Sequence, residues 1–250
     1  MGKVTPDQII LALDVDTAQE ALTWAKRLQG RVGICKVGLQ LYLREGESVL
    51  RGLANLGIPV FLDLKFHDIP NTVGQAVAAV GMWKPRFLTL HASGGREMME
   101  AARTKAPAET CLLGVTVLTS LSEAGAKEIG WSHGVEASVH QLSSLAKAAG
   151  LGGVVCSPHE AKSERNRWGA EGEIVTPGVR PTGSAHGDQN RVLTPQEAIQ
   201  QGASRIVVGR PVLQAAQPEA ILDQILATDG AVVPTSKSAA RGKVHGQRDR

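Results

Sequence analysis

Short apolar runs alternate with amphipathic helical stretches along almost the whole chain, and this alternation limits the fold more than any other feature. Strands that alternate with helices belong to βαβ units, in which neighbouring strands run parallel. We therefore expect an α/β protein built on a parallel sheet. The eight expected strands lie at residues 8–15, 33–38, 60–66, 87–91, 112–118, 153–157, 173–177 and 205–208.

Helices are expected between these strands, and two of them have recognisable ends. Thr17 and Glu20 have the spacing of a capping box, and Gly30 suits the end of the helix that begins there. Residues 194–197 repeat the pattern with a proline at the first helical position, and Gly202 suits the end of that helix. The other expected helices occupy residues 40–56, 71–83, 96–105, 135–149, 160–168 and 219–228.

Alternation alone is compatible with a closed (β/α)8 barrel and with an open doubly wound sheet. The count of eight strands and the polar residues at their carboxyl ends favour the closed TIM barrel. A barrel of this kind is commonly a single domain at a length of 250 residues. We therefore predict one α/β barrel domain over residues 1–228, followed by a basic tail at residues 229–250 that we expect to be disordered.

Charge and hydropathy exclude several classes of protein. Hydrophobic residues make up 42% of the chain and charged residues 20%, and no apolar run has the length needed to span a bilayer. Without the five basic residues and one acidic residue of residues 235–250, the 27 basic and 24 acidic residues become 22 and 23. The body of the chain therefore lacks the basic excess of a nucleic-acid-binding protein. Because the start has no apolar signal region, we expect a cytoplasmic location and no membrane partner.

Residues 61–72, with the sequence Phe-Leu-Asp-Leu-Lys-Phe-His-Asp-Ile-Pro-Asn-Thr, form the most unusual stretch. Side chains repeat every two residues along a strand, so Phe61, Asp63 and Lys65 are expected to share one side. A carboxylate and an ammonium group would then lie together at the end of an otherwise apolar strand, and Asp68 follows shortly after. Because such charges are costly to bury unless they are paired, we interpret this stretch as a functional site.

The carboxyl ends of the other strands carry polar residues as well, and in TIM barrels these ends form the active site. Arg180 follows the seventh strand, and Arg210 follows Gly209 at the end of the eighth, where barrels often bind a phosphate. Arginine can hold phosphate oxygens through two hydrogen bonds, and glycine lets the backbone N–H approach an anion. Two arginines in solvated loops are the alternative interpretation. The strand-end candidates are Asp14, Lys36, Asp63, Lys65, His91, Thr119, Ser157, Arg180 and Arg210.

A metal site is a less favoured interpretation of these residues. Asp14, Asp63, Asp68 and His91 carry suitable ligand atoms, but two lysines would share their cavity and repel a cation. We interpret His91 as a hydrogen-bonded residue of the barrel rather than as a catalytic one. The cysteines lie in separate apolar runs without metal-ligand spacing and are expected to be reduced core residues. They are Cys35, Cys111 and Cys156.

Residues 63–72 closely resemble the signature of the orotidine 5′-phosphate decarboxylase family in its compact bacterial form. The similarity covers the chain from about Ile9 to Ala227, and its blocks follow the order of the family. The resemblance implies a TIM barrel that converts orotidine 5′-monophosphate to UMP and CO₂, the last step of UMP synthesis, without a cofactor or a metal ion. The further similar blocks lie at residues 11–14, 36–38, 115–120, 176–181, 187–189 and 208–211.

The resemblance also implies a catalytic group. Lys36, Asp63, Lys65 and Asp68 match the alternating charged tetrad of the family, in which Lys65 is the proton donor. Loss of CO₂ from C6 of the pyrimidine leaves electron density without a neighbouring carbonyl to accept it, so fixed charge must stabilise that carbon. One ammonium group at ~4 Å supplies roughly 4 kcal/mol, which is below the ~8–23 kcal/mol that enzymes typically supply. Contacts with the phosphate and ribose, and closure of a lid at residues 180–191, are expected to contribute the rest.

Further roles follow from the same resemblance. Asp68, Ile69 and Thr72 match residues that reach the active site of the other subunit, which implies a homodimer with shared sites. Asp14 and Lys36 match contacts with ribose hydroxyls. Thr119 matches a residue of the nucleotide-binding site near the base. The phosphate-binding group of the family is matched by Arg180, Gln189, Gly209 and Arg210. The full set of expected substrate-binding residues is Asp14, Lys36, Asp63, Leu64, Lys65, Phe66, His67, Asp68, Ile69, Pro70, Asn71, Thr72, Thr119, Arg180, Gln189, Gly209 and Arg210.

Three other functions stay open at this point. Related barrel enzymes that act on sugar phosphates share the Asp-x-Lys-x-x-Asp core but use magnesium and have an acidic residue where Lys36 stands, so the lysine argues against them. A nucleotide-binding barrel without catalysis is disfavoured, because a site for a carboxylate would hardly hold two acids. A nucleic-acid-binding module that uses the basic tail predicts salt-sensitive binding that is lost when residues 235–250 are deleted.

Overall fold

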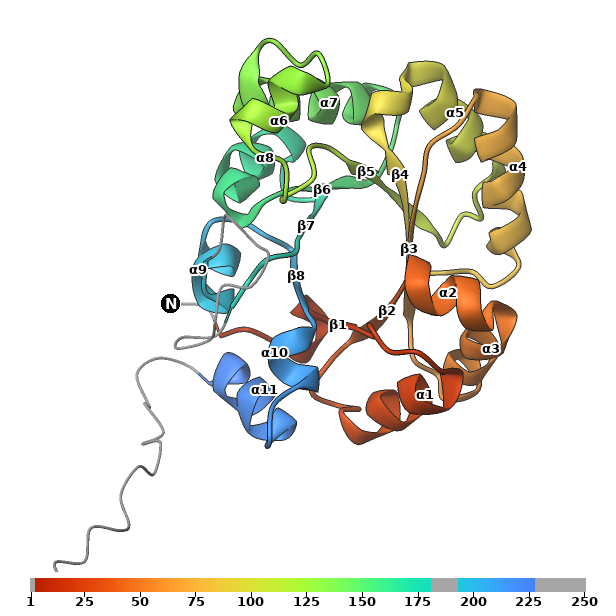
Figure 1. Ribbon diagram of the computed structural model, residues 1–250, viewed down its shortest axis with the longest axis vertical. Coiled ribbons are helices and arrows are strands. Elements are labelled where there is room, and N and C mark those ends of the chain that lie inside the picture. The colour runs from red at the N-terminus through yellow and green to blue at the C-terminus, as the bar shows by residue number, and fades with distance from the viewer. Residues whose placement is uncertain (1–2, 181–192, 228–250) are drawn as a thin grey trace, which may run out of the picture.

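The computed structural model describes residues 3–180 and 193–227. Their strands run parallel and form a closed barrel in which each strand pairs with its neighbours in sequence and the last pairs with the first (Figure 1). The predicted TIM barrel is therefore confirmed, and an open sheet is excluded. The strands are β1 Ile9–Ala12, β2 Ile34–Gly38, β3 Val60–Phe66, β4 Phe87–His91, β5 Cys111–Val115, β6 Gly153–Val155, β7 Glu173–Thr176 and β8 Arg205–Val208.

Helices surround the barrel (Figure 1). Two of them, α1 and α9, begin directly after the predicted capping residues Thr17 and Thr194. The Thr17 hydroxyl accepts the Glu20 N–H at 3.2 Å at the start of α1. Thr194 and Glu197 form a complete capping box before α9. The helices are α1 Ala18–Arg27, α2 Leu39–Glu45, α3 Glu47–Asn55, α4 Pro70–Gly81, α5 Arg96–Lys105, α6 Glu123–Glu128, α7 Gly134–Ala148, α8 Ala161–Trp168, α9 Pro195–Gln200, α10 Arg210–Leu213 and α11 Pro218–Leu226, with short 3-10 helices at Pro6–Gln8, Ala92–Gly94 and Pro158–Glu160.

The prediction of one continuous helix over residues 40–56 is wrong, because the structure contains two helices there, α2 and α3. Gly46 separates them with φ +53° and ψ −124°, a conformation outside the helical region that glycine reaches most easily. Its N–H still donates to the Tyr42 carbonyl at 2.7 Å, so α2 ends in a normal turn before α3 begins. Periodicity does not predict the short helices α6 and α10, because each spans fewer than two turns and leaves little pattern to detect.

Apolar side chains form two separate layers on the two sides of the barrel wall. The larger layer lies between the strands and the surrounding helices and includes Leu62 and Leu64 of β3. The smaller one fills the barrel interior, where the Phe61 and Phe87 rings meet edge to face with centroids 5.9 Å apart. The members of this interior layer are Ile10, Ala12, Ile34, Phe61, Phe87, Leu113, Val175 and Val207.

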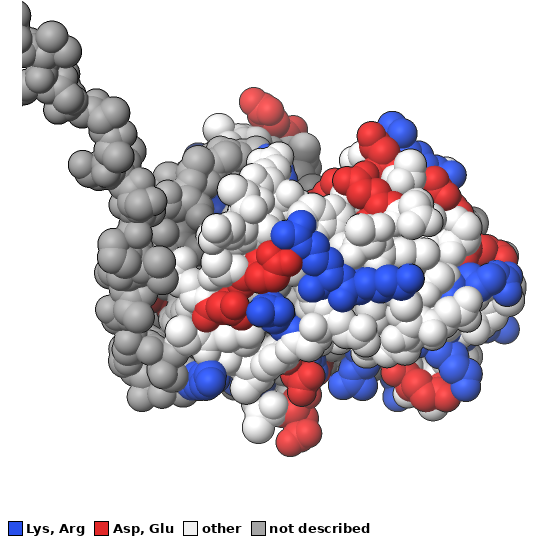
Figure 2. All heavy atoms as spheres, turned by 90° about the horizontal axis from the view of Figure 1, so that it is seen from below, with Lys and Arg blue, Asp and Glu red and all other residues white. Residues whose placement is uncertain are grey.

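Ion pairs join the end of α1 and the loop after it to α11, on the outer side of the barrel near the β1–β8 pairing. Arg27 at the end of α1 and Arg31 in the loop after it each make two hydrogen bonds to a carboxylate of α11, those of Glu219 and Asp223. Figure 2 shows the face of the molecule on which α1 and α11 lie in Figure 1, and basic and acidic side chains are interspersed across it. Across residues 3–180 and 193–227, no helix is both long and apolar enough to cross a membrane.

The expected division into domains remains a prediction. Residues 3–180 and 193–227 contain the whole barrel. The expected tail at residues 229–250 lies outside the described residues, and so do Gln189 and the rest of the expected lid beyond Arg180.

Candidate active site

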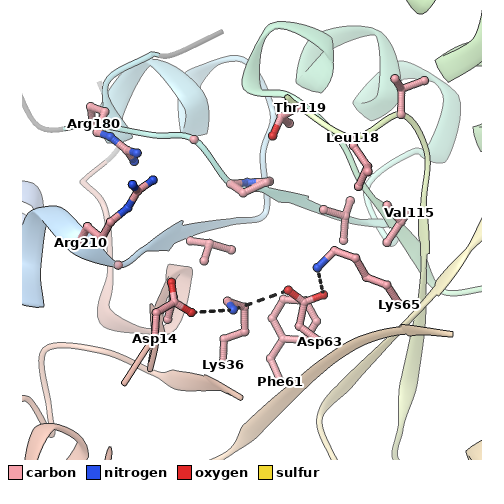
Figure 3. Close-up of a pocket in the computed structure, with 17 residues that line it drawn as sticks. Asp14, Lys36, Phe61, Asp63, Lys65, Val115, Leu118, Thr119, Arg180 and Arg210 are labelled. Carbon is pink, nitrogen blue, oxygen red and sulfur yellow. Dashed lines mark hydrogen bonds and ion pairs between the residues drawn. The ribbon is translucent and has the colours of Figure 1, made fainter. Parts of the chain in front are cut away.

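A cavity of about 250 Å³ opens at the carboxyl ends of the barrel strands, the end at which TIM-barrel enzymes hold their active sites. Its floor consists of side chains from the interior apolar layer, and charged side chains rise around it (Figure 3). The residues that line it are Ala12, Asp14, Lys36, Phe61, Asp63, Lys65, Val115, Val117, Leu118, Thr119, Val155, Pro177, Gly178, Arg180, Val207, Gly209 and Arg210.

Four charged side chains, one from just after β1, one from β2 and two from β3, form a continuous row along one side of this cavity (Figure 3). The Lys36 ammonium lies 3.3 Å from Oδ1 of Asp14 and 3.6 Å from Oδ2 of Asp63. The Lys65 ammonium lies 2.8 Å from Oδ1 of Asp63. Acids and lysines therefore alternate, and each lysine is next to at least one carboxylate. The side chains of Lys36 and Asp63 are only 12% exposed, so solvent screens their interaction weakly.

The pKa of the Asp63 carboxyl lies below its usual value. Burial by itself would raise that pKa, but the ammonium groups of Lys36 and Lys65 and the hydrogen bonds from Lys65 and Thr89 outweigh it. Asp63 is therefore a carboxylate at neutral pH, and it fixes the place of both ammonium groups. The row is preorganised before any substrate binds.

Lys65 has an unusual backbone. Its φ is +50°, in the left-handed region that costs a residue with a Cβ atom about 1–2 kcal/mol. The register of β3 against β4 also shifts there, because Leu62 is opposite Leu88 whereas Phe66 is opposite Leu90. Three residues of β3 thus bulge over one residue of β4, and a bulge of this kind can redirect a side chain next to an active site. Asp63 and Lys65 both line the cavity in spite of the bulge, as the two-residue alternation predicted.

Thr89 is the residue of β4 opposite the bulge, and the sequence interpretation missed it. Its hydroxyl accepts the backbone N–H of Lys65 at 2.9 Å and donates to Oδ1 of Asp63 at 3.0 Å. The signal was available, because Phe87 and Thr89 alternate onto the same side of β4, and Phe87 belongs to the interior layer. Its position inside an apolar strand made Thr89 resemble an ordinary core residue.

Two arginines lie at the other end of the cavity. Arg180 follows β7 and Arg210 begins α10 after β8, and Figure 3 shows their guanidinium groups directed toward each other above the cavity. Gly209 precedes Arg210, and a Cβ atom there would lie 3.2 Å from that of Ala12 and 3.5 Å from an Asp14 carboxylate oxygen. A side chain at Gly209 would therefore crowd the passage between the arginines and the charged row. Thr119 lines the wall of the cavity between these two ends.

His91 and His67 form a pair of mutually tilted rings beside the cavity without lining it. Their ring centroids are 5.2 Å apart. Burial lowers the pKa of His91, and the neighbouring His67 and Lys65 lower it further, so the ring is neutral at pH 7. A neutral ring at this place does not compete with the ammonium groups for the Asp63 carboxylate.

Several expected substrate-binding residues lie outside this cavity in the single chain. Asp68, Ile69 and Thr72 are exposed around the start of α4, and the Asp68 carboxylate accepts the Ile69 N–H at 2.6 Å. The side chain of Leu64 is buried in the layer between strands and helices. Phe66 packs partly against the same layer. The other members of this group, His67, Pro70 and Asn71, lie in the β3–α4 connection and the first turn of α4.

Metal ligands are not assembled in the described residues, since no three His, Cys, Asp or Glu side chains there come together as a metal site. The cysteines are free thiols, and burial raises the pKa of Cys35 and of Cys111 to about 12. Both thiols are therefore protonated at neutral pH and are poor ligands and nucleophiles.

Comparison with known proteins identifies the group to which this barrel belongs. Residues 7–225 match the family model described as the orotidine 5′-phosphate decarboxylase / HUMPS family. The chain belongs to this family. It is 48% identical over 221 residues to an orotidine 5′-phosphate decarboxylase of Anaeromyxobacter dehalogenans, covering 88% of this chain and 97% of that protein. Its identity to an orotidine 5′-phosphate decarboxylase of Sphingopyxis alaskensis is 44% over 220 residues, covering 88% and 98%.

Solved structures agree with this membership of the orotidine 5′-phosphate decarboxylase / HUMPS family. The crystal structure of orotidine 5′-phosphate decarboxylase from Lactobacillus acidophilus matches with a TM-score of 0.77 at 35% identity, covering 88% of this chain and 97% of that one. The corresponding structure from Pyrococcus horikoshii matches with a TM-score of 0.70 at 25% identity, covering 88% and 100%. The resemblance seen in residues 63–72 and the further blocks is therefore confirmed at the level of the family.

Proposed function

We propose that this protein is a cytoplasmic enzyme that decarboxylates orotidine 5′-monophosphate to UMP and CO₂, the last step of UMP synthesis. The observation that carries the proposal is the alternating row of Asp14, Lys36, Asp63 and Lys65 in a cavity whose other end holds two arginines. A monophosphate and a carboxylated base are the two ends of this substrate, and each end has a cationic counterpart in the cavity. The similar proteins named orotidine 5′-phosphate decarboxylase support the same assignment.

The proposed binding mode follows from these two ends. The phosphate lies between Arg180 and Arg210, where the backbone at Gly209 allows close approach. The ribose hydroxyls meet Asp14 and Lys36, which lie between the arginines and Asp63. The pyrimidine then has its C6 next to Lys65, with Thr119 beside the base. Gln189 is a further proposed phosphate ligand.

Lys65 is the proposed proton donor. The bond between C6 and the carboxyl carbon breaks, CO₂ leaves, and the bonding electron pair stays on C6. The Lys65 ammonium stabilises that charge and transfers a proton to C6, after which the neutral amine regains a proton from solvent. All atoms and charges balance without a cofactor or a metal ion, so we propose that the enzyme needs neither. Asp63 holds the ammonium group in place, and Lys36, which pairs with the other oxygen of the same carboxylate, completes the row.

Contacts away from C6 must supply much of the catalysis. At ~4 Å and an effective dielectric constant near 20, one ammonium group stabilises a unit charge by roughly 4 kcal/mol. Enzymes typically lower barriers by ~8–23 kcal/mol, so positioning of the substrate through its phosphate and ribose must provide the remainder. We propose that residues 180–191 close over the phosphate and that this closure excludes water from the cavity.

A homodimer with shared sites is the proposed assembly. Asp68, Ile69 and Thr72 lie on the surface, and Ile69 is 65% exposed. Exposed apolar residues also occur on α2, where Leu43 is 79% exposed. Contact with a second copy would cover this apolar surface and bring Asp68 to the charged row of the other copy, where it would complete the tetrad that Lys36, Asp63 and Lys65 begin.

The alternative within the family is a magnesium-dependent enzyme that acts on a sugar phosphate, because the family model joins orotidine 5′-phosphate decarboxylases with the HUMPS group. Lys36 argues against it, because its ammonium lies within 3.3–3.6 Å of Asp14 and Asp63 and occupies the place of a cation between them. A divalent ion there would meet a positive charge at close range.

The decisive experiment follows the ultraviolet absorbance of orotidine 5′-monophosphate with purified protein, before and after exhaustive treatment with EDTA. We expect decarboxylation at the same rate in both samples. Absence of activity in both would refute the function, and activity that EDTA removes and magnesium restores would favour the alternative enzyme. A chain ending at residue 228 should be equally active, which tests the proposed domain boundary.

A further inference from the structure

The bulge of β3 places the backbone of Lys65 in an unfavourable conformation, and the ion pairs of the charged row do not hold that backbone. Lys65 has a left-handed backbone at a point where the register between β3 and β4 shifts, so its N–H cannot join a regular ladder. A buried backbone N–H without a partner destabilises the fold, and a residue with a Cβ atom does not stay in the left-handed region unless its surroundings hold it. Some group of the protein must therefore hold Lys65 in this conformation.

Thr89 is that group. It is fully buried, and its single hydroxyl makes two hydrogen bonds at once, accepting from the Lys65 N–H at 2.9 Å and donating to Oδ1 of Asp63 at 3.0 Å. The Lys65 ammonium contacts the same Oδ1 at 2.8 Å. The interactions therefore form a closed ring that runs from the Lys65 backbone through Thr89 and Asp63 to the end of the Lys65 side chain.

Other buried threonines at the strand ends do something different. The hydroxyl of Thr116 donates to the backbone carbonyl of Val155, and that of Thr176 donates to the carbonyl of Arg205. Among the residues that the structure describes, these hydroxyls bond only to neutral backbone groups of the neighbouring strand. Thr89 instead connects a strained backbone to a carboxylate of the cavity, which is a role in the geometry of the site rather than in strand pairing.

We propose that Thr89 is a positioning residue, which fixes the backbone of Lys65 directly and its ammonium group through Asp63, so that the proton of Lys65 is presented to the substrate. The effect on catalysis rests on the proposed function, whereas the effect on the geometry of Lys65 does not. Loss of the hydroxyl leaves the Lys65 N–H unpaired and removes one hydrogen-bond donor from Oδ1 of Asp63. The backbone and the ammonium group of Lys65 are then both less firmly positioned.

The test compares Thr89→Val, which keeps the shape but removes the hydroxyl, with Thr89→Ser, which keeps the hydroxyl. We expect Thr89→Val to lower kcat by roughly 10- to 100-fold, because displacement of a reacting group by about 1 Å can cost 10²-fold. KM for orotidine 5′-monophosphate should change little, since the phosphate contacts remain intact. Thr89→Ser should restore most of kcat. A kcat for Thr89→Val within twofold of the wild type, or equal loss in both variants, would overturn the proposal.

Thr110→Val is the matched control. Thr110 is also a buried threonine, and its hydroxyl oxygen has no hydrogen-bond partner within the part of the chain that the structure describes. The same loss of a hydroxyl there should leave kcat unchanged. A fall in kcat as large as that of Thr89→Val would mean that removing any buried hydroxyl disturbs the barrel, and the specific role of Thr89 would be disproved.

Two measurements do not depend on activity. Hydrogen exchange of the Lys65 amide should be slow in the wild type and in Thr89→Ser and faster in Thr89→Val, and NMR titration should give a higher Asp63 pKa in Thr89→Val. Rapid exchange of the Lys65 amide in the folded wild type would refute the proposal even if no variant could be purified. If the wild type failed to decarboxylate orotidine 5′-monophosphate while this exchange pattern held, the proposed function would fail and the positioning of Lys65 by Thr89 would stand.

Discussion

Replacement of Lys65 by alanine tests the central chemical step most directly. The variant removes the ammonium that would stabilise the charge on C6, an interaction worth roughly 4 kcal/mol or about 10³-fold in rate. It also removes the proton donor, and general acid catalysis typically contributes about 10²- to 10⁴-fold. If the two effects add, Lys65→Ala lowers kcat by about 10⁵- to 10⁷-fold, which is below detection in an ordinary absorbance assay.

The folded state should survive this change. Asp63 loses the ammonium at 2.8 Å but keeps Lys36 at 3.6 Å and the Thr89 hydroxyl at 3.0 Å, so its buried carboxylate stays paired. Lys84 offers a matched control, because Lys65 and Lys84 are the two non-glycine residues with positive φ among the residues that the structure describes. Lys84→Ala therefore places alanine in the same strained region, but its side chain pairs with Glu109 far from the cavity.

The assay combines decarboxylation of orotidine 5′-monophosphate with calorimetric binding of UMP. We expect Lys65→Ala to bind UMP and to show no turnover, and Lys84→Ala to match the wild type in both measurements. A Lys65→Ala variant that keeps kcat within tenfold of the wild type would refute the role of Lys65 as proton donor. Loss of UMP binding together with a loss of folded structure by circular dichroism would show that the fold needs the complete row and that Lys36 and Thr89 alone do not keep the Asp63 carboxylate stable.

Three further predictions test other parts of the molecule. Arg210→Ala should lower kcat/KM by about 2–5 kcal/mol for the phosphorylated substrate but leave the slow reaction of the phosphate-free nucleoside unchanged, and equal losses for both would show that Arg210 does not bind the phosphate. Because burial raises the pKa of Cys35 and Cys111 to about 12, neither thiol should react with a disulfide reagent at pH 8 until the protein unfolds; rapid modification of the native protein would contradict this. Gly153→Ala should destabilise the protein by about 2–4 kcal/mol in urea unfolding, because the new Cβ would lie 2.0 Å from the Glu173 carbonyl oxygen across β6 and β7, and an unchanged midpoint would show that the strands can move apart freely.

Much of the fold was predictable because strand periodicity and turn residues are local. The ends of β3, β4 and β8 agree with the predicted ranges, and the capping residues Thr17 and Thr194 mark the starts of α1 and α9. The break at Gly46 was not predictable from periodicity, because α2 and α3 present apolar residues with a spacing that one continuous helix would also produce. A single glycine inside such a pattern indicates an interruption only weakly.

The charged residues of the candidate site were predictable from the sequence, but the hydrogen bonds from Thr89 that hold Lys65 and Asp63 were not. Asp14, Lys36, Asp63 and Lys65 line one cavity because parallel strands deliver their carboxyl ends to one place, a rule that needs no three-dimensional information. Alternation along β4 could place Thr89 on the inner side of the barrel, but its contact with Lys65 depends on the shifted register between two strands, and no local pattern reports a register. The role of Asp68 depends on a second copy of the chain and stays a prediction.

The interior layer of the barrel restricts which substitutions in the cavity the fold can tolerate. Ala12, Phe61 and Val207 belong to that layer and also form the floor of the cavity, so the depth of the cavity is determined by the same side chains that fill the barrel. A smaller residue there would open a void inside the strands, and a larger one would push them apart. Acceptance of bulkier or smaller bases should therefore evolve at the rim, where Leu118 is 43% exposed and Thr119 stands beside it, while the floor changes little.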